Sequence, residues 1–234
     1  MKNILYLFLA LASYGTSAQT TAEEYMISGE SKFYLDDMKG AIVDYTKAIK
    51  IDSNFVEAYR KRGLAKEGLK DFSGAIVDYT KAIEIDPNYF SAYRDRGISK
   101  DKLKDFSGAI ADFNKAIEIE PNYALAFNDR GITKGKLKDF SGAIADYNKA
   151  IEIAPNYALA FNDRGITKGK LKDFSGAITD YNKAIEIDPN YAIAYFNRGV
   201  SKFNTGDMIG ACKDARKAQK LGDDALILIK KACN

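Results

Sequence analysis

The chain has 234 residues, of which 46% are hydrophobic and 29% charged, with a formal net charge of +3 and no histidine. This composition is typical of a folded protein and argues against a disordered chain or one that mainly binds nucleic acid. The lack of histidine excludes Ser-His-Asp and Cys-His catalysis and an imidazole metal ligand.

Residues 1–18 have the features of a cleaved secretory signal peptide. Lys2 provides a positive start, residues 4–12 form an apolar run, and small residues at 16–18 precede Gln19. The apolar run is too short to span a bilayer, and no later stretch is long and apolar enough to do so. We therefore predict an exported protein without a membrane span, located in the periplasm, the cell envelope or outside the cell. The alternative is a disordered leader.

A period of 34 residues covers most of the remaining chain. An aromatic residue lies four positions before each recurring glycine, and alanines lie twelve and nineteen positions after it. The glycines are Gly29, Gly63, Gly97, Gly131, Gly165 and Gly199. Such self-similarity indicates units that each bury their apolar face against neighbouring units rather than around one central core.

Each unit has the pattern of two helices. The first unit begins with Thr21 and Glu24, which form a predicted capping box. In the second unit, the apolar spacing predicts helices over residues 56–69 and 72–85, with Asp71 as the N-cap between them. Pro87 then ends the second helix, because proline cannot continue it. No strand pattern occurs, so we predict an all-α fold.

These positions resemble the tetratricopeptide repeat (TPR), a family whose 34-residue unit carries aromatics, a glycine, two alanines and a proline at fixed offsets. The resemblance covers six units, which are followed by a capping helix at 226–234. The units are 22–55, 56–89, 90–123, 124–157, 158–191 and 192–225. It implies a right-handed superhelical solenoid whose first helices form a concave wall along which a partner lies. We expect each glycine to face an alanine of the second helix, and aromatics such as Tyr79 to fill the space toward the next unit.

Two charged positions depart from the family pattern. An arginine precedes the glycine in five units, and an aspartate recurs on the second helix. We predict that they form a ladder of ion pairs, each contributing at most about 1 kcal/mol if exposed. The arginines are Arg62, Arg96, Arg130, Arg164 and Arg198, and the aspartates are Asp44, Asp78, Asp112, Asp146, Asp180 and Asp214. The alternative is a basic groove that binds an acidic partner.

One face of the first helices is the candidate binding site, because its positions share a side of the helical wheel. Asparagine amides can pair with a peptide backbone, and leucine and isoleucine can receive apolar side chains. The residues that we predict to contact an extended peptide are Arg60, Arg94, Leu125, Asn128, Asp129, Ile132, Leu159, Asn162, Asp163, Ile166 and Asn197. The alternative is that they are solvent-facing helix residues without a function.

The C-terminal segment departs from the repeat. We predict a last helix from about residue 225 to 233, capped by Asp223 and Asp224. Cys212 lies on the second helix of the last unit, and Cys233 stands 34 residues after Gly199. Because adjacent antiparallel helices can bring them together, we predict a disulfide worth roughly 3 kcal/mol in an oxidising compartment. The alternative is two buried free thiols.

The sequence thus predicts a non-catalytic scaffold, with a monomer favoured, that binds a protein or peptide and needs no cofactor or metal. The chaperone-binding carboxylate clamp of the family is excluded, since it needs an asparagine directly after the glycine. That place holds Leu64, Ile98, Ile132, Ile166 and Val200. One alternative is a structural subunit of an envelope or surface complex, held through the convex face and the C-terminal cap. Another is glycan recognition by Phe33, Tyr34, Phe196 and Phe203.

Overall fold

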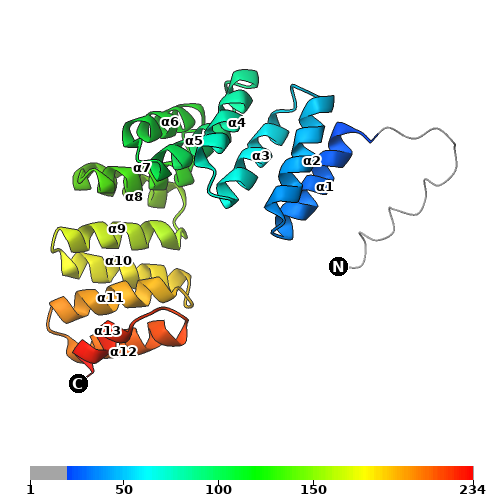
Figure 1. Ribbon diagram of the computed structural model, residues 1–234. Coiled ribbons are helices and arrows are strands. Elements are labelled where there is room, and N and C mark those ends of the chain that lie inside the picture. The colour runs from blue at the N-terminus through cyan, green and yellow to red at the C-terminus, as the bar shows by residue number, and fades with distance from the viewer. Residues whose placement is uncertain (1–19, 234) are drawn as a thin grey trace.

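The computed structural model describes residues 20–233, which form thirteen α-helices and no strand (Figure 1). The predicted signal peptide lies outside the described residues. The first helices of the six pairs are α1 (Ala22–Tyr34), α3 (Val56–Gly68), α5 (Phe90–Lys102), α7 (Ala124–Lys136), α9 (Ala158–Lys170) and α11 (Ala192–Asn204). The second helices are α2 (Met38–Ile51), α4 (Phe72–Ile85), α6 (Phe106–Ile119), α8 (Phe140–Ile153), α10 (Phe174–Ile187) and α12 (Met208–Lys220). A last helix, α13 (Leu226–Ala232), follows. The predicted all-α fold is confirmed, and the helix pairs are consistent with six units.

Capping side chains fix where α1 and the second helix of every pair begin. Thr21 and Glu24 form the predicted capping box of α1. The aspartate before each second helix accepts a hydrogen bond from the glycine amide three residues later, as Asp71 does from Gly74 at 2.9 Å. The same bond recurs from α2 to α12, so one local motif starts every second helix.

The stacking of the pairs places the first helices on the inner wall. Each first helix contacts the first helix of the next pair, whereas successive second helices make no such contact within residues 20–233. Figure 1 shows the pairs stacked side by side along a curved path from α1 to α13. The first helices are therefore closer together and line the concave side.

Aromatic rings are the nearest groups to five of the six recurring glycines, where we expected an alanine, and only Gly199 has an alanine, Ala211, among its nearest neighbours. A Cβ built on Gly63 would lie 2.5 Å from Cε1 of Tyr79. The same relationship recurs at Gly29, Gly97, Gly131 and Gly165. The missing side chain makes room for a ring that lies across the helix backbone. The rings of units three to five also reach the space before the next unit, as expected, where they line pockets.

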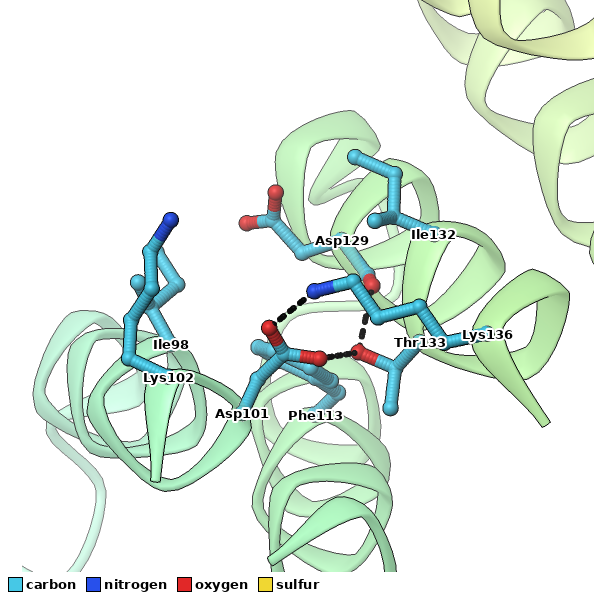
Figure 2. A pocket seen from close by; sticks show the side chains of 8 residues that line it. All are labelled: Ile98, Asp101, Lys102, Phe113, Asp129, Ile132, Thr133 and Lys136. Atoms are coloured by element: carbon cyan, nitrogen blue, oxygen red, sulfur yellow. Dashed lines mark hydrogen bonds and ion pairs between the residues drawn. The ribbon is translucent and has the colours of Figure 1, made fainter. Parts of the chain in front are cut away.

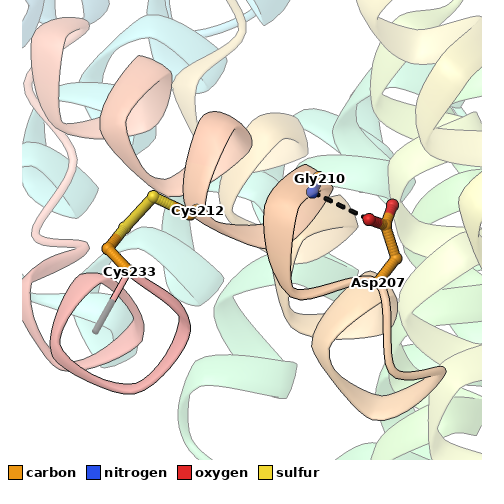
Figure 3. The surroundings of a disulfide bond; sticks show 4 residues. All are labelled: Asp207, Gly210, Cys212 and Cys233. Atoms are coloured by element: carbon orange, nitrogen blue, oxygen red, sulfur yellow. Dashed lines mark hydrogen bonds between the residues drawn. A yellow bond between two sulfur atoms is a disulfide. The ribbon is translucent and has the colours of Figure 1, made fainter.

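The last unit lacks this ring, and α13 compensates for it. Ala215 stands where the other units have tyrosine or phenylalanine, and Leu228 of α13 lies 3.0 Å from the position of a Cβ on Gly199. The predicted disulfide between Cys212 and Cys233 is present and joins α12 to the end of α13, with 5.0 Å between the Cα atoms (Figure 3). Ala225 occupies the N-cap of α13, so neither predicted aspartate stands at that position, but Asp224 Oδ1 accepts a hydrogen bond from the Leu226 amide at 3.4 Å.

The arginine–aspartate ladder is confirmed, and it is more buried than we assumed. The structure pairs Arg62 with Asp78, Arg96 with Asp112, Arg130 with Asp146, Arg164 with Asp180, and Arg198 with Asp214. In each pair Arg Nη2 lies 2.6–2.7 Å from Asp Oδ1, while a lysine Nζ lies 2.8 Å from the other oxygen. The aspartate side chains are 2–6% exposed, so the limit for exposed pairs does not apply to them. Each arginine also bonds a threonine or asparagine of the preceding unit, as Arg130 does with Asn114 at 2.6 Å. These arginines hold the units together and are not free in a basic groove.

Candidate functional site

Polar side chains cross the inner wall in a series of rungs between successive first helices. Each rung joins two residues 35 positions apart. The rungs are Arg60 Nε to Asp95 Oδ2 at 2.7 Å, Arg94 Nε to Asp129 Oδ2 at 2.6 Å, Asn128 Nδ2 to Asp163 Oδ2 at 3.1 Å, and Asn197 Nδ2 to Asn162 Oδ1 at 3.0 Å. The wall is thus cross-linked along the solenoid by its own side chains.

Seven of the residues that we predicted to contact a peptide are members of these rungs. They are Arg60, Arg94, Asn128, Asp129, Asn162, Asp163 and Asn197. In the structure these side chains bond to one another rather than pointing toward a ligand. Asn128 is 0% exposed and Asn162 is 3% exposed, which corrects our expectation of amides on an open wall. Both side chains are enclosed where neighbouring first helices pack, so they hold the wall in shape.

The charge of the rungs changes along the wall. The first two rungs are ion pairs, the third joins a carboxylate to a neutral amide, and the fourth joins two amides. Burial raises the pKa of Asp163, while hydrogen bonds from Asn128 and Asn162 lower it only in part. Burial also raises the pKa of Asp129, but there the Arg94 guanidinium opposes it. Asp163 is therefore the carboxylate of the rungs that has no cationic partner.

Three pockets open on the inner wall at the repeat period. They lie between α5 and α7, between α7 and α9, and between α9 and α11, with volumes of about 130, 220 and 320 Å³. An aromatic ring of the intervening second helix lines each pocket, and an aliphatic side chain lines it from each first helix. The aliphatic residues are Ile98, Ile132, Ile166 and Val200. Ile132 and Ile166, both predicted site residues, each line two successive pockets.

The first pocket is partly filled by the protein's own charged groups (Figure 2). The carboxylate of Asp101 accepts a hydrogen bond from Thr133 at 2.9 Å and pairs with Lys136. Gly135 and Gly169 take the place of Asp101 in the next two pockets. A Cβ on Gly169 would meet nothing within 4 Å, and both of these pockets are larger than the first.

The remaining predicted residues, Leu125 and Leu159, are 38% and 39% exposed. Leu125 lies apart from the three wall pockets, in a shallow hollow beside Pro155 and Tyr157 at the turn between two units.

Two further wall residues, Tyr89 and Tyr123, were not predicted from the sequence. Their rings lie 5.8 and 5.9 Å from the guanidinium groups of Arg60 and Arg94. Their repeated position could have pointed to them, since both tyrosines stand two residues after the proline of their repeat.

Sequence models of one repeat family match most of this array. A model described as "TPR repeat" matches residues 29–70 and 170–206, and "Tetratricopeptide repeat" models match residues 56–89, 124–157 and 91–123. The chain belongs to the tetratricopeptide repeat family. It folds as a right-handed superhelical TPR solenoid, the architecture of a protein-interaction scaffold.

Solved TPR structures share this fold. The chain is 17% identical to a chain of the Cut9–Hcn1 hetero-tetramer of APC/C, with a TM-score of 0.80. The match covers 92% of this chain and 43% of that chain. It is 27% identical to MamA, with a TM-score of 0.62 and coverages of 73% and 93%. It is 22% identical to YrrB, described as a TPR protein with an unusual peptide-binding site, with a TM-score of 0.61 and coverages of 81% and 98%. No curated protein matches the chain in sequence.

Within residues 20–233, each helix is too short or too polar to cross a bilayer.

Proposed function

We propose that this TPR protein is a non-catalytic scaffold that binds an extended peptide or protein segment along its concave wall. The observation that carries the proposal is the recurrence of three pockets along that wall, at the same places in successive units. Side chains of an extended segment can enter such pockets one after another, because each combines an aromatic ring with aliphatic side chains. The fold supports this use, since YrrB is described as having a peptide-binding site.

In this proposal the wall residues have two roles. Ile132 and Ile166 contact the bound segment, together with the exposed Leu125 and Leu159. The rung residues hold the first helices in register, so that the pockets are formed before the ligand arrives. Preformed pockets favour affinity, because little side-chain ordering remains to be done on binding.

We also propose that the protein is exported. The positive and apolar start of the chain supports export through a cleaved signal peptide. The disulfide between Cys212 and Cys233 is a further support, since disulfides persist mainly in oxidising compartments.

A second candidate function is a structural subunit held through other surfaces. Exposed apolar side chains away from the pockets favour it, such as Val77 on α4, which is 66% exposed, and Ile209 on α12, which is 86% exposed. Because single exposed apolar side chains are also common on monomeric proteins, we rank this candidate below groove binding.

Site-specific photocrosslinking in the source cells tests both candidates. A photoreactive amino acid replaces Ile166 in the pockets, Val77 on α4, or Ile209 on α12. We expect a crosslinked partner from position 166, to be identified by mass spectrometry, and none from 77 or 209. A partner captured from 77 or 209 alone would reject groove binding and support the structural subunit.

A further inference from the structure

We propose that Asp163 forms a subsite for a cationic side chain, a lysine or arginine of the bound segment that enters the pocket between α7 and α9. This inference rests on the proposed function, because it assigns a charge preference to one pocket of the same wall.

The comparison of rungs shows what is missing at Asp163. Asp95 and Asp129 each receive a guanidinium from the preceding unit, at 2.7 and 2.6 Å. At Asp163 the preceding unit supplies the neutral amide of Asn128, at 3.1 Å. The second contact, from Asn162 at 3.3 Å, is also an amide. The carboxylate position is therefore retained in this rung while its internal cation is absent.

The pocket beside Asp163 has room for an external cation. Its volume is about 220 Å³, and Gly135 stands where the preceding pocket holds the side chain of Asp101. A Cβ on Gly135 would meet only the Cβ of Ala143, at 4.0 Å. In the first pocket the carboxylate of Asp101 pairs with Lys136. One unit later Gly135 has no carboxylate, so the equivalent pair with Lys170 cannot form.

The charged groups around Asp163 leave this place open to a cation. Asp129, on the neighbouring first helix, is also negatively charged, although Arg94 pairs with it at 2.6 Å. Lys136 lines the pocket but is paired with Asp101. Lys170 also lines the pocket, seven residues after Asp163 on the same helix, and is the internal group that can compete with a ligand. Burial raises the pKa of Asp163, which reflects solvation that the carboxylate has lost and that a cation would replace.

The remaining lining selects a long cationic side chain over a small cation. Ile132, Ile166 and the ring of Tyr147 form the apolar part of the pocket. The aliphatic stem of lysine or arginine can pack against these groups while its charged end reaches the carboxylate. A hydrated metal ion or free ammonium ion gains nothing from that apolar lining.

Selection from a phage-displayed library of random 12-residue peptides tests the subsite. The purified protein is compared with three variants. D163N removes the carboxylate, and N128R supplies the cation that Arg60 and Arg94 supply in their own rungs. E152Q is the matched control, because it removes one negative charge from an exposed side chain outside the pockets. Thermal unfolding of each variant confirms that it is folded.

We expect the protein and E152Q to select peptides with lysine or arginine at one position between apolar residues. D163N and N128R should keep the apolar preference and lose the basic one. For a selected peptide, replacing its lysine by norleucine should weaken binding to the protein about tenfold and leave binding to D163N unchanged.

Each other outcome has a distinct meaning. Selected peptides without a basic position, or with one that both D163N and N128R retain, would overturn the Asp163 subsite and leave peptide binding intact. If the protein selects no peptide at all, the proposed function fails, and this inference fails with it. If D163N does not fold, N128R decides alone, since its added guanidinium occupies the subsite from within the chain.

Discussion

The ring of Tyr147 lies directly against the backbone of Gly131, so close that a Cβ on this residue would be 2.7 Å from Cε1 of the ring. We therefore predict that Gly131→Ala destabilises the protein by about 1–3 kcal/mol, because the added methyl group displaces a buried ring. Equilibrium unfolding in urea measures the change. The matched control is Gly169→Ala, also within a first helix, where a Cβ would meet nothing within 4 Å. There alanine should be neutral or stabilise by up to about 1 kcal/mol through helix propensity. Equal losses in both variants would contradict the packing role of Gly131.

The buried ion pair between Arg130 and Asp146 leads to a second prediction. Arg130→Ala should cost about 2–4 kcal/mol, because it leaves a buried carboxylate with Lys134 as its remaining cation. The control is Lys149→Ala, which breaks an exposed pair with Glu152 and should cost less than about 1 kcal/mol. Denaturant titration of both variants compares them. A loss of the same size in both would show that the ladder is no more stabilising than a surface pair.

The disulfide should stabilise one end of the solenoid rather than all of it. The double variant Cys212→Ser, Cys233→Ser should lower the protection of α12 and α13 against hydrogen exchange, by up to roughly 3 kcal/mol in local opening free energy. Protection of α7 and α9 should stay nearly unchanged, since each unit contacts only its neighbours. Hydrogen exchange followed by mass spectrometry resolves the two regions. Uniform deprotection along the chain would contradict this local role.

The pH dependence of stability should reveal the free-energy cost of burying the Asp163 carboxylate without a cationic partner. Burial raises its pKa above the ordinary value of 3.8, so the folded state binds the proton more tightly than the unfolded state does. The resulting contribution to stability is fully present below pH 3.8 and is lost as the pH rises through the folded-state pKa. D163N should therefore unfold at a higher temperature than the wild type at pH 7, by roughly 2 °C.

The advantage of D163N should shrink as the pH falls toward 3.8 and vanish below it. Asp173 provides a control of opposite sign, because its hydrogen bond from the Gly176 amide lowers its pKa. D173N should lose stability at neutral pH, and the difference from the wild type should diminish as the pH falls. Melting curves from pH 3 to pH 8 test both variants. A D163N curve parallel to that of the wild type would show that Asp163 carries no such cost.

Features that depend on neighbours in the sequence were predicted well. The helix over residues 72–85 was placed correctly, because its N-cap Asp71 and its stop at Pro87 act within a few residues. The ladder from Arg130 to Asp146 and the disulfide of Cys212 were also predicted. Both connect adjacent antiparallel helices, whose pairing follows from a short turn.

Features of the inner wall were predicted less well. A helical wheel places Asn128 and Asp163 on the same face, but it cannot say that they bond to each other, since the rung joins residues 35 apart in a 34-residue repeat. That offset of one position belongs to the packing of successive first helices, since it appears in all four rungs. It decides which amides are buried and which pockets remain open.

The sequence alone was enough to predict the repeating helix pairs, the caps of their second helices and the C-terminal disulfide, because those depend on local chemistry and on the period. Only the packed solenoid decided that Gly131 makes room for a ring, that Asn128 is enclosed, and that Asp163 has no cation. Each of these depends on the distance and crossing of two helices, a property of the assembled units that neither helix carries in its own sequence.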